Sequence, residues 1–110
     1  MEFKDAQRKV KEMSGSLEHP RLASFIALTE EVGEIANEIM KHEIYEEKDH
    51  SNDISSEVAD TLFALLELAN VYGIDLDHEF SKKLESLQPR FEEWKKSFGE
   101  KMVEKRKKHN

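Results

Sequence analysis

Hydrophobic residues recur at three- and four-residue spacing along most of the chain, which is the period of an amphipathic helix. No stretch alternates hydrophobic and polar residues for long, and the four glycines and two prolines do not fall at strand-like intervals. The pattern therefore predicts an all-α fold with four helices. We expect helices over residues 3–13, from residue 20 to about 45, from the Ser51–Asp53 caps to Gly73, and from Asp75 or Asp77 onward.

Prolines, glycines and short polar residues mark the expected ends of these helices. Pro20 suits the first turn of the second helix, and Gly73 suits a left-handed stop after the third. Residues 46–53 read as a polar loop, in which Ser51, Asn52 and Asp53 offer caps for the third helix. Pro89 should kink or restart the fourth helix. The basic tail, about residues 101–110, should fray or lie exposed.

The second helix carries its acids beside its hydrophobic stripe. At about 100° per residue, one apolar stripe collects Phe25, Leu28, Val32, Ile35, Ala36 and Ile39. Glu31, Glu34 and Glu38 fall together on the flank of that stripe, with Glu30 slightly further round. A purely solvating face would lie opposite the core, so these acids border the core instead.

The third helix is apolar on nearly every side between Val58 and Tyr72. Such a helix should be buried all round, and four helices of this size cannot bury it alone. We therefore expect a partner subunit to complete the bundle. Glu57 and Asp60 stand at the start of this helix, one turn apart, on the side shared with Ala64 and Glu67.

Composition narrows the function classes. The chain has 110 residues, enough for a single domain spanning 1–110, and it contains no cysteine, which excludes thiolate metal sites. A charged N-terminus and no long apolar run favour a cytoplasmic protein without a membrane partner. The net charge of −7 argues against binding nucleic-acid polymers. An anionic substrate would need a metal or a local cluster of cations to approach.

Two pairs of carboxylates at three-residue spacing supply a candidate metal site. Residues three apart point the same way, so Glu31 pairs with Glu34 and Glu57 with Asp60. If the two helices are antiparallel neighbours, four carboxylates converge, and their repulsion is relieved by a divalent cation. An all-oxygen ligand set suits Mg²⁺, with Mn²⁺ as a possible substitute.

Each piece of this pattern also has a simpler explanation. Glutamates in a charged helix most often form a solvated face, and Glu38, which lies outside the motif, is an outer or surface acid. Glu47 and His50 have the spacing of a di-iron ligand pair, but they fall in the acidic loop, where solvation is the better interpretation. Trp94 could stack on a base, although packing with Phe91 and Phe98 explains it as well.

The combined pattern resembles a known family. "EEVGE" (residues 30–34), a gap over residues 35–56 and "EVAD" (residues 57–60) resemble the EExxE…ExxD signature of the MazG-like nucleoside triphosphate pyrophosphohydrolases. The resemblance covers roughly residues 22–91. It implies a four-helix protein that assembles as a homodimer or homotetramer, with core helices from two subunits forming the bundle.

The resemblance also implies a reaction. A metal-activated water attacks the α-phosphorus of an NTP or dNTP and releases the monophosphate and pyrophosphate, a house-cleaning activity. By motif match, Glu31, Glu34, Glu57 and Asp60 would hold Mg²⁺. Glu30, which matches the first Glu of the motif, would support the catalytic site from outside the ligand set or help to hold a further ion. Which carboxylate orients or deprotonates the water is left open, and Glu34 is the one we expect.

The same resemblance predicts only part of the set of side chains that would bind the substrate phosphates. Lys83 and Arg90 match a family pattern of Lys, Asn and Arg, and would bind phosphate, but Leu87 stands where the Asn is expected. Pro89 is also unusual there. Ordinary helix solvation explains Lys83 and Arg90 equally well. The rival function is a noncatalytic helical binding or oligomerisation module that keeps the fold.

Overall fold

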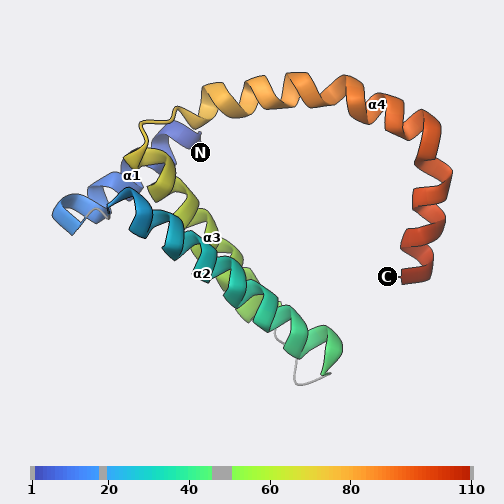
Figure 1. Cartoon of the computed structure of the whole chain (residues 1–110), viewed down its shortest axis with the longest axis horizontal. Coiled ribbons are helices and arrows are strands. Elements are labelled where there is room, and N and C mark those ends of the chain that lie inside the picture. The colour runs from blue at the N-terminus through green and yellow to red at the C-terminus, as the bar shows by residue number, and fades with distance from the viewer. Residues whose placement is uncertain (1, 18–19, 46–50, 110) are drawn as a thin grey trace. The chain divides into compact units, whose positions relative to one another are not determined.

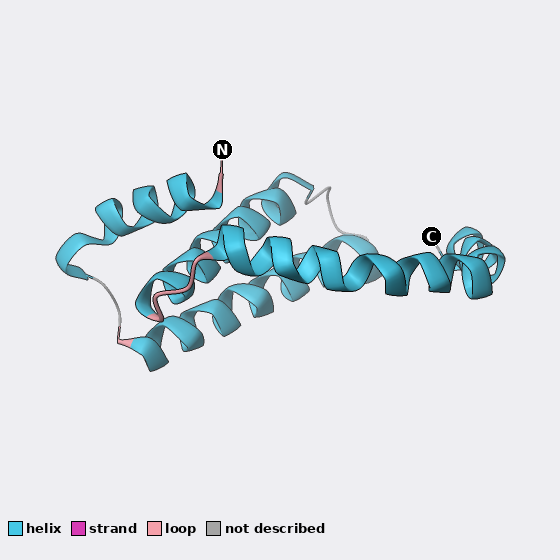
Figure 2. Ribbon diagram, turned by 90° about the horizontal axis from the view of Figure 1, so that it is seen from above, coloured by secondary structure: helices cyan, strands magenta, loops and turns pink. Residues whose placement is uncertain are grey.

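The computed structural model describes residues 2–17, 20–45 and 51–109, and within these ranges the chain is helical with no strand. This confirms the predicted all-α, four-helix fold. Figure 2 shows that the described loops between helices are short. The elements are α1 (Phe3–Ser14), a 3-10 turn η1 (Gly15–Leu17), α2 (Arg21–Ile39), a π-helical turn η2 (Met40–Ile44), α3 (Ser51–Val71) and α4 (Leu76–His109).

The chain divides into two compact units, Met1–Leu76 and Asp77–Asn110. In the first unit α2 and α3 lie side by side and run antiparallel, as the two views show (Figures 1 and 2). α1 packs against α3. The second unit consists of α4 after its first residue. The antiparallel α2–α3 pair places the two acidic motifs on neighbouring helices.

A pair of amides fastens α1 to the end of α3. The Gln7 side chain donates hydrogen bonds to the Asn70 Oδ1 atom at 3.2 Å and to the Ile74 carbonyl at 2.8 Å. Asn70 returns a bond from Nδ2 to the Gln7 carbonyl at 2.9 Å, and the Leu76 N–H donates to Gln7 Oε1 at 3.3 Å. These bonds fix the turn after α3 against α1.

The helix ends follow the sequence signals in most places. Gly73 has φ of 65°, the left-handed conformation predicted for the stop of α3, and the Ile74 N–H donates to the Ala69 carbonyl at 2.9 Å. Pro20 is the residue before α2 and not inside its first turn, and its carbonyl accepts a bond from the Ser24 N–H at 3.0 Å. α4 begins directly after Asp75.

Three boundaries differ from the predictions. α2 does not stay α-helical to residue 45, because Met40–Ile44 forms a wider π turn in which the Tyr45 N–H reaches the Met40 carbonyl at 3.1 Å. The predicted loop is shorter than expected, because α3 already begins at Ser51. Pro89 does not restart α4, which continues through it as one curved helix (Figure 1). Glu47, His50 and the cap position before Ser51 lie outside the described residues.

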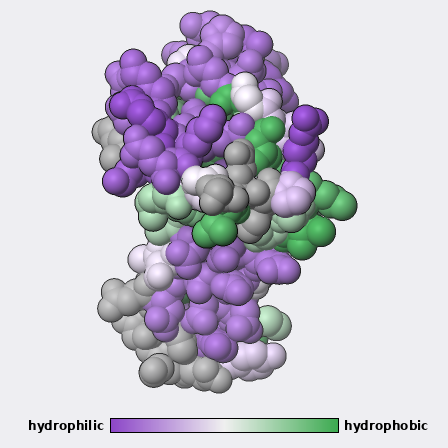
Figure 3. All heavy atoms as spheres, turned by 90° about the vertical axis from the view of Figure 1, so that its left-hand side faces the viewer, coloured by the Kyte–Doolittle hydropathy of each residue, from purple (hydrophilic) through white to green (hydrophobic). Residues whose placement is uncertain are grey.

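Few side chains are fully buried within one chain. The buried hydrophobic residues are Val10, Ala64, Leu66 and Ala69. By contrast, Val32 on α2 is 51% exposed and Leu62 on α3 is 48% exposed. Hydrophobic side chains gather among hydrophilic ones on the face in Figure 3. Much of the predicted core stripe is therefore uncovered in one copy, as are the residues of the basic tail from Lys101 to His109.

Candidate metal centre

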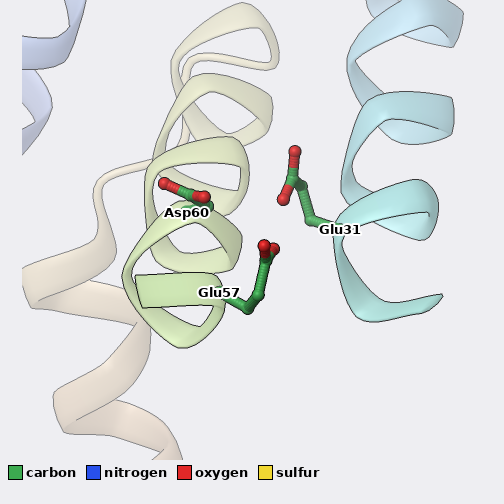
Figure 4. Close-up of side chains that lie close together, drawn as sticks. All are labelled: Glu31, Glu57 and Asp60. Carbon is green, nitrogen blue, oxygen red and sulfur yellow. The ribbon is translucent and has the colours of Figure 1, made fainter. Parts of the chain in front are cut away.

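The α2–α3 pair brings carboxylates from both acidic motifs together. Oxygen atoms of Glu31, Glu57 and Asp60 all lie within 4.8 Å of one another. Figure 4 shows Glu31 reaching from α2 and Glu57 from α3 into the same space, with Asp60 beside them on α3. Glu57 and Asp60 are one helical turn apart, so the ExxD spacing puts both on the side that faces α2.

Glu34, the fourth predicted ligand, is exposed and stands outside that group of three, but it interacts with both glutamates. A hydrogen bond that the protonated Glu57 carboxyl donates to Glu34 is the main cause that raises the pKa of Glu57 to about 7. Burial and the charges of the neighbouring carboxylates add to that increase. The Glu57 carboxyl therefore holds a proton near neutral pH when no cation is bound.

Glu31 responds to the same crowding. Burial is the largest cause that raises the pKa of Glu31, followed by the charges of Glu34 and Asp60. A hydrogen bond with Glu57 acts in the opposite direction, and Glu30 contributes the smallest increase. Glu30 is exposed, which agrees with a place at the edge of the cluster.

These carboxylates fit a divalent cation. The Oε2 atoms of Glu31 and Glu57 are both buried without a hydrogen-bond partner, although a buried carboxylate oxygen ordinarily needs one. The donor set is oxygen throughout, which suits Mg²⁺ or Mn²⁺. A cation held by these oxygens would replace the missing partners and remove the mutual repulsion that raises both pKa values.

The two predicted phosphate ligands belong to the second unit. Lys83 and Arg90 are exposed on α4. The guanidinium of Arg90 lies 5.4 Å from the centre of the Trp94 ring, and Trp94 meets Phe91 edge-on with 5.1 Å between ring centres. The contact between the Phe91 and Trp94 rings thus supports the interpretation that Trp94 is a packing residue. The substrate roles of Lys83 and Arg90 stay predictions.

Glu38 is more buried than its position outside the motif suggested. It was expected to be an outer or surface acid, but its side chain is only 16% exposed and pairs with Lys41, whose Nζ atom lies 3.5 Å from Glu38 Oε1. A signal was present in the spacing, because residues 31, 34, 38 and 41 follow one side of a helix at intervals of three and four.

Comparison with known proteins gives one match. The MazG nucleotide pyrophosphohydrolase domain matches residues 21–94, a range that holds both acidic motifs. No curated protein and no solved structure matches the chain.

In the described ranges, no helix combines the length and the apolar character that a membrane span needs. Because the domain covers more than half of its residues, the chain belongs to the MazG nucleotide pyrophosphohydrolase family.

Proposed function

We propose that this protein is a Mg²⁺-dependent nucleoside triphosphate pyrophosphohydrolase that acts on an NTP or dNTP in the cytoplasm. The observation that carries the proposal is the cluster of Glu31, Glu57 and Asp60, within 4.8 Å and with two buried oxygens lacking partners. The family match supplies the reaction class. Members of this family generally depend on a divalent metal, which the cluster suits.

The reaction exchanges one bond for another. The oxygen of a water molecule bonds to the α-phosphorus, the bond from that phosphorus to the α–β bridging oxygen breaks, and the products are a monophosphate and pyrophosphate. The bound metal would supply charge neutralisation and polarisation of the phosphate oxygens and of the water. Glu31, Glu34, Glu57 and Asp60 would hold it, and Glu30 would support them from the rim.

We assign Glu34 as the base that accepts a proton from the attacking water. Glu34 is exposed, so it can reach a reacting group outside the helix pair, and it lies within hydrogen-bond reach of Glu57 in the cluster. A base must lie within hydrogen-bond reach of the proton it takes. The proton released by the attacking water would pass to Glu34 and then to solvent.

Assembly belongs to the same proposal. The exposed hydrophobic residues of α2 and α3, among them Val32 and Leu62, offer apolar surface that suits a second copy of the chain. Burying this surface would complete the bundle, in a homodimer or a homotetramer. Lys83 and Arg90 are proposed to contact the substrate phosphates.

The test is pyrophosphate release from a panel of NTPs and dNTPs. We expect release with Mg²⁺ or Mn²⁺ and none with chelator. The double variant Glu34→Gln with Asp60→Asn should abolish it, whereas Glu12→Gln, an exposed position on α1, should not. The alternative, a noncatalytic helical module, predicts two results for the wild-type protein. It releases no pyrophosphate from any nucleotide, and millimolar Mg²⁺ does not change its melting temperature.

A further inference from the structure

The proposed site is rich in carboxylates and needs a positive charge for its substrate. A nucleoside triphosphate carries several negative charges on its terminal phosphates, and a metal bound by four carboxylates is largely neutralised by them. Cations near developing phosphate charge are a recurring part of phosphoryl transfer. Such a charge should come from a lysine or arginine on the acidic side of α2, among the described residues of the first unit.

Most cations of that unit lie elsewhere. Arg21 starts α2 and lies over the Tyr72 ring at 5.4 Å, and the remaining described ones except Lys41 are on α1: Lys4, Arg8, Lys9 and Lys11. Lys41 alone among these described cations follows the acidic row Glu31, Glu34 and Glu38. Glu34 lies about 10 Å back along the helix axis from Lys41. Because side chains on a helix tilt toward its N-terminus, the Lys41 ammonium lies closer to Glu34 than this backbone distance.

The Glu38–Lys41 pair directs Lys41 toward the cluster. Side chains on a helix tilt toward its N-terminus, and the 3.5 Å contact shows that Lys41 Nζ reaches back to Glu38, the residue after Glu34 in the row. Glu38 is 16% exposed and Lys41 is 37% exposed, so the pair is better anchored than an ordinary surface ion pair. Lys41 also lies in the π turn Met40–Ile44, a type of distortion frequent at functional sites.

We propose that Lys41, positioned by Glu38, binds the terminal phosphates of the substrate, the part that leaves as pyrophosphate. The inference rests on the proposed function and extends it to the recognition of phosphate-chain length. Lys41 Nζ would donate hydrogen bonds to the terminal phosphate oxygens in place of part of its contact with Glu38. A diphosphate has fewer phosphates beyond the reacting one, so triphosphates gain more from Lys41.

The test compares Lys41→Gln with wild type in two measurements. The first is KM for the best nucleotide together with the inhibition constant of inorganic pyrophosphate. Loss of one charge-assisted interaction should raise both by roughly tenfold or more, with a smaller change in kcat. The second is the rise in melting temperature caused by pyrophosphate with Mg²⁺, which should shrink, while the rise caused by Mg²⁺ alone stays as in wild type.

Matched variants separate binding from folding. Lys9→Gln removes the same charge from an exposed position on α1 and should behave as wild type. Lys41→Arg should restore most of the affinity. Because Lys41→Gln removes the cation that pairs with Glu38, the double variant Glu38→Gln with Lys41→Gln repeats the measurement without the Glu38 charge. It should show the same loss of pyrophosphate binding.

Failure of this inference is distinct from failure of the proposed function. If wild type hydrolyses nucleotides but Lys41→Gln and the double variant keep both constants within about twofold, Lys41 has no phosphate role. If wild type hydrolyses nothing, the proposed function fails. The pyrophosphate-induced melting shift then decides the role of Lys41, because equal shifts in wild type and Lys41→Gln would overturn it.

Discussion

Two sides of the α2–α3 pair invert the usual distribution of polar and apolar side chains. On one side the carboxylates of Glu31 and Glu57 are partly buried, each with an oxygen lacking a partner. On the other, Val32 and Leu62 are about half exposed. Glu31 and Val32 are neighbours in sequence, yet the charged residue is the more buried of the two. The proposed function accounts for both sides, with a cation on the acidic side and a second copy of the chain on the other.

The largest effect should come from removing a carboxylate at the centre of the cluster. Glu57→Gln should lower pyrophosphate release by roughly 100- to 1,000-fold, because one ligand of the metal and the charge that holds it are lost. The metal-free variant should melt at a higher temperature than metal-free wild type, since the amide removes repulsion. Steady-state assays and thermal melts measure both changes. A variant with lower activity and a lower metal-free melting temperature would point to lost packing instead.

A charge placed on the hydrophobic side should separate the copies. Leu62→Lys should weaken self-association by roughly 100-fold, because an unpaired buried charge costs about 3–5 kcal/mol. Sedimentation equilibrium over a range of protein concentrations measures this. Asn37→Lys adds the same charge at an exposed polar position of α2 and serves as the control. If Leu62→Lys leaves association unchanged, this side of the helix pair is not the interface.

The smallest effect concerns pH. The folded pKa of Glu57 is about 7, above the ordinary value of 4.5, so the folded metal-free protein holds this proton more tightly than the unfolded chain does. The resulting stabilisation is complete below pH 4.5 and is lost as the pH rises through about 7. Metal binding needs the ionised carboxyl, so the melting shift caused by Mg²⁺ should grow between about pH 6 and pH 8.

Thermal melts at fixed Mg²⁺ concentration follow this trend, with metal-free samples at each pH as the reference. Glu57→Gln cannot titrate at this position and should show a flatter profile. A Mg²⁺ shift that is the same at about pH 6 and pH 8 in wild type would contradict proton competition at Glu57.

The sequence predicted the helices, the Gly73 stop and the pairing of the two acidic motifs, because these depend on local spacing. Positions three apart share a helix side whatever the rest of the chain does. The π turn after Ile39 was not predictable in this way, since it has no spacing signal of its own. Pro89 was expected to kink or restart α4; the helix does not restart, because one missing hydrogen bond is tolerated in a helix of 34 residues.

Burial was harder to predict than position. The pattern placed Glu38 outside the motif, and only packing shows that its side chain is largely enclosed and holds Lys41. The pattern also left open which carboxylate activates the water, because the hydrogen bond between Glu57 and Glu34 depends on how the two helices pack. The spacing of residues within one helix determines which side chains point the same way. The contacts between helices determine the pKa values of those side chains.

The Gln7–Asn70 bonds have a consequence for how the protein folds. They join residues 63 positions apart, whereas the α2–α3 hairpin needs only a short connection to form. Closing the longer loop between Gln7 and Asn70 loses more chain entropy than closing the α2–α3 hairpin, and this loss comes before any contact can offset it. We therefore expect α2 and α3 to pair early, with their acidic motifs already in register, and α1 to dock last. In the native state, α1 should be the first helix of the first unit whose amides exchange with solvent, while the acidic cluster is still intact.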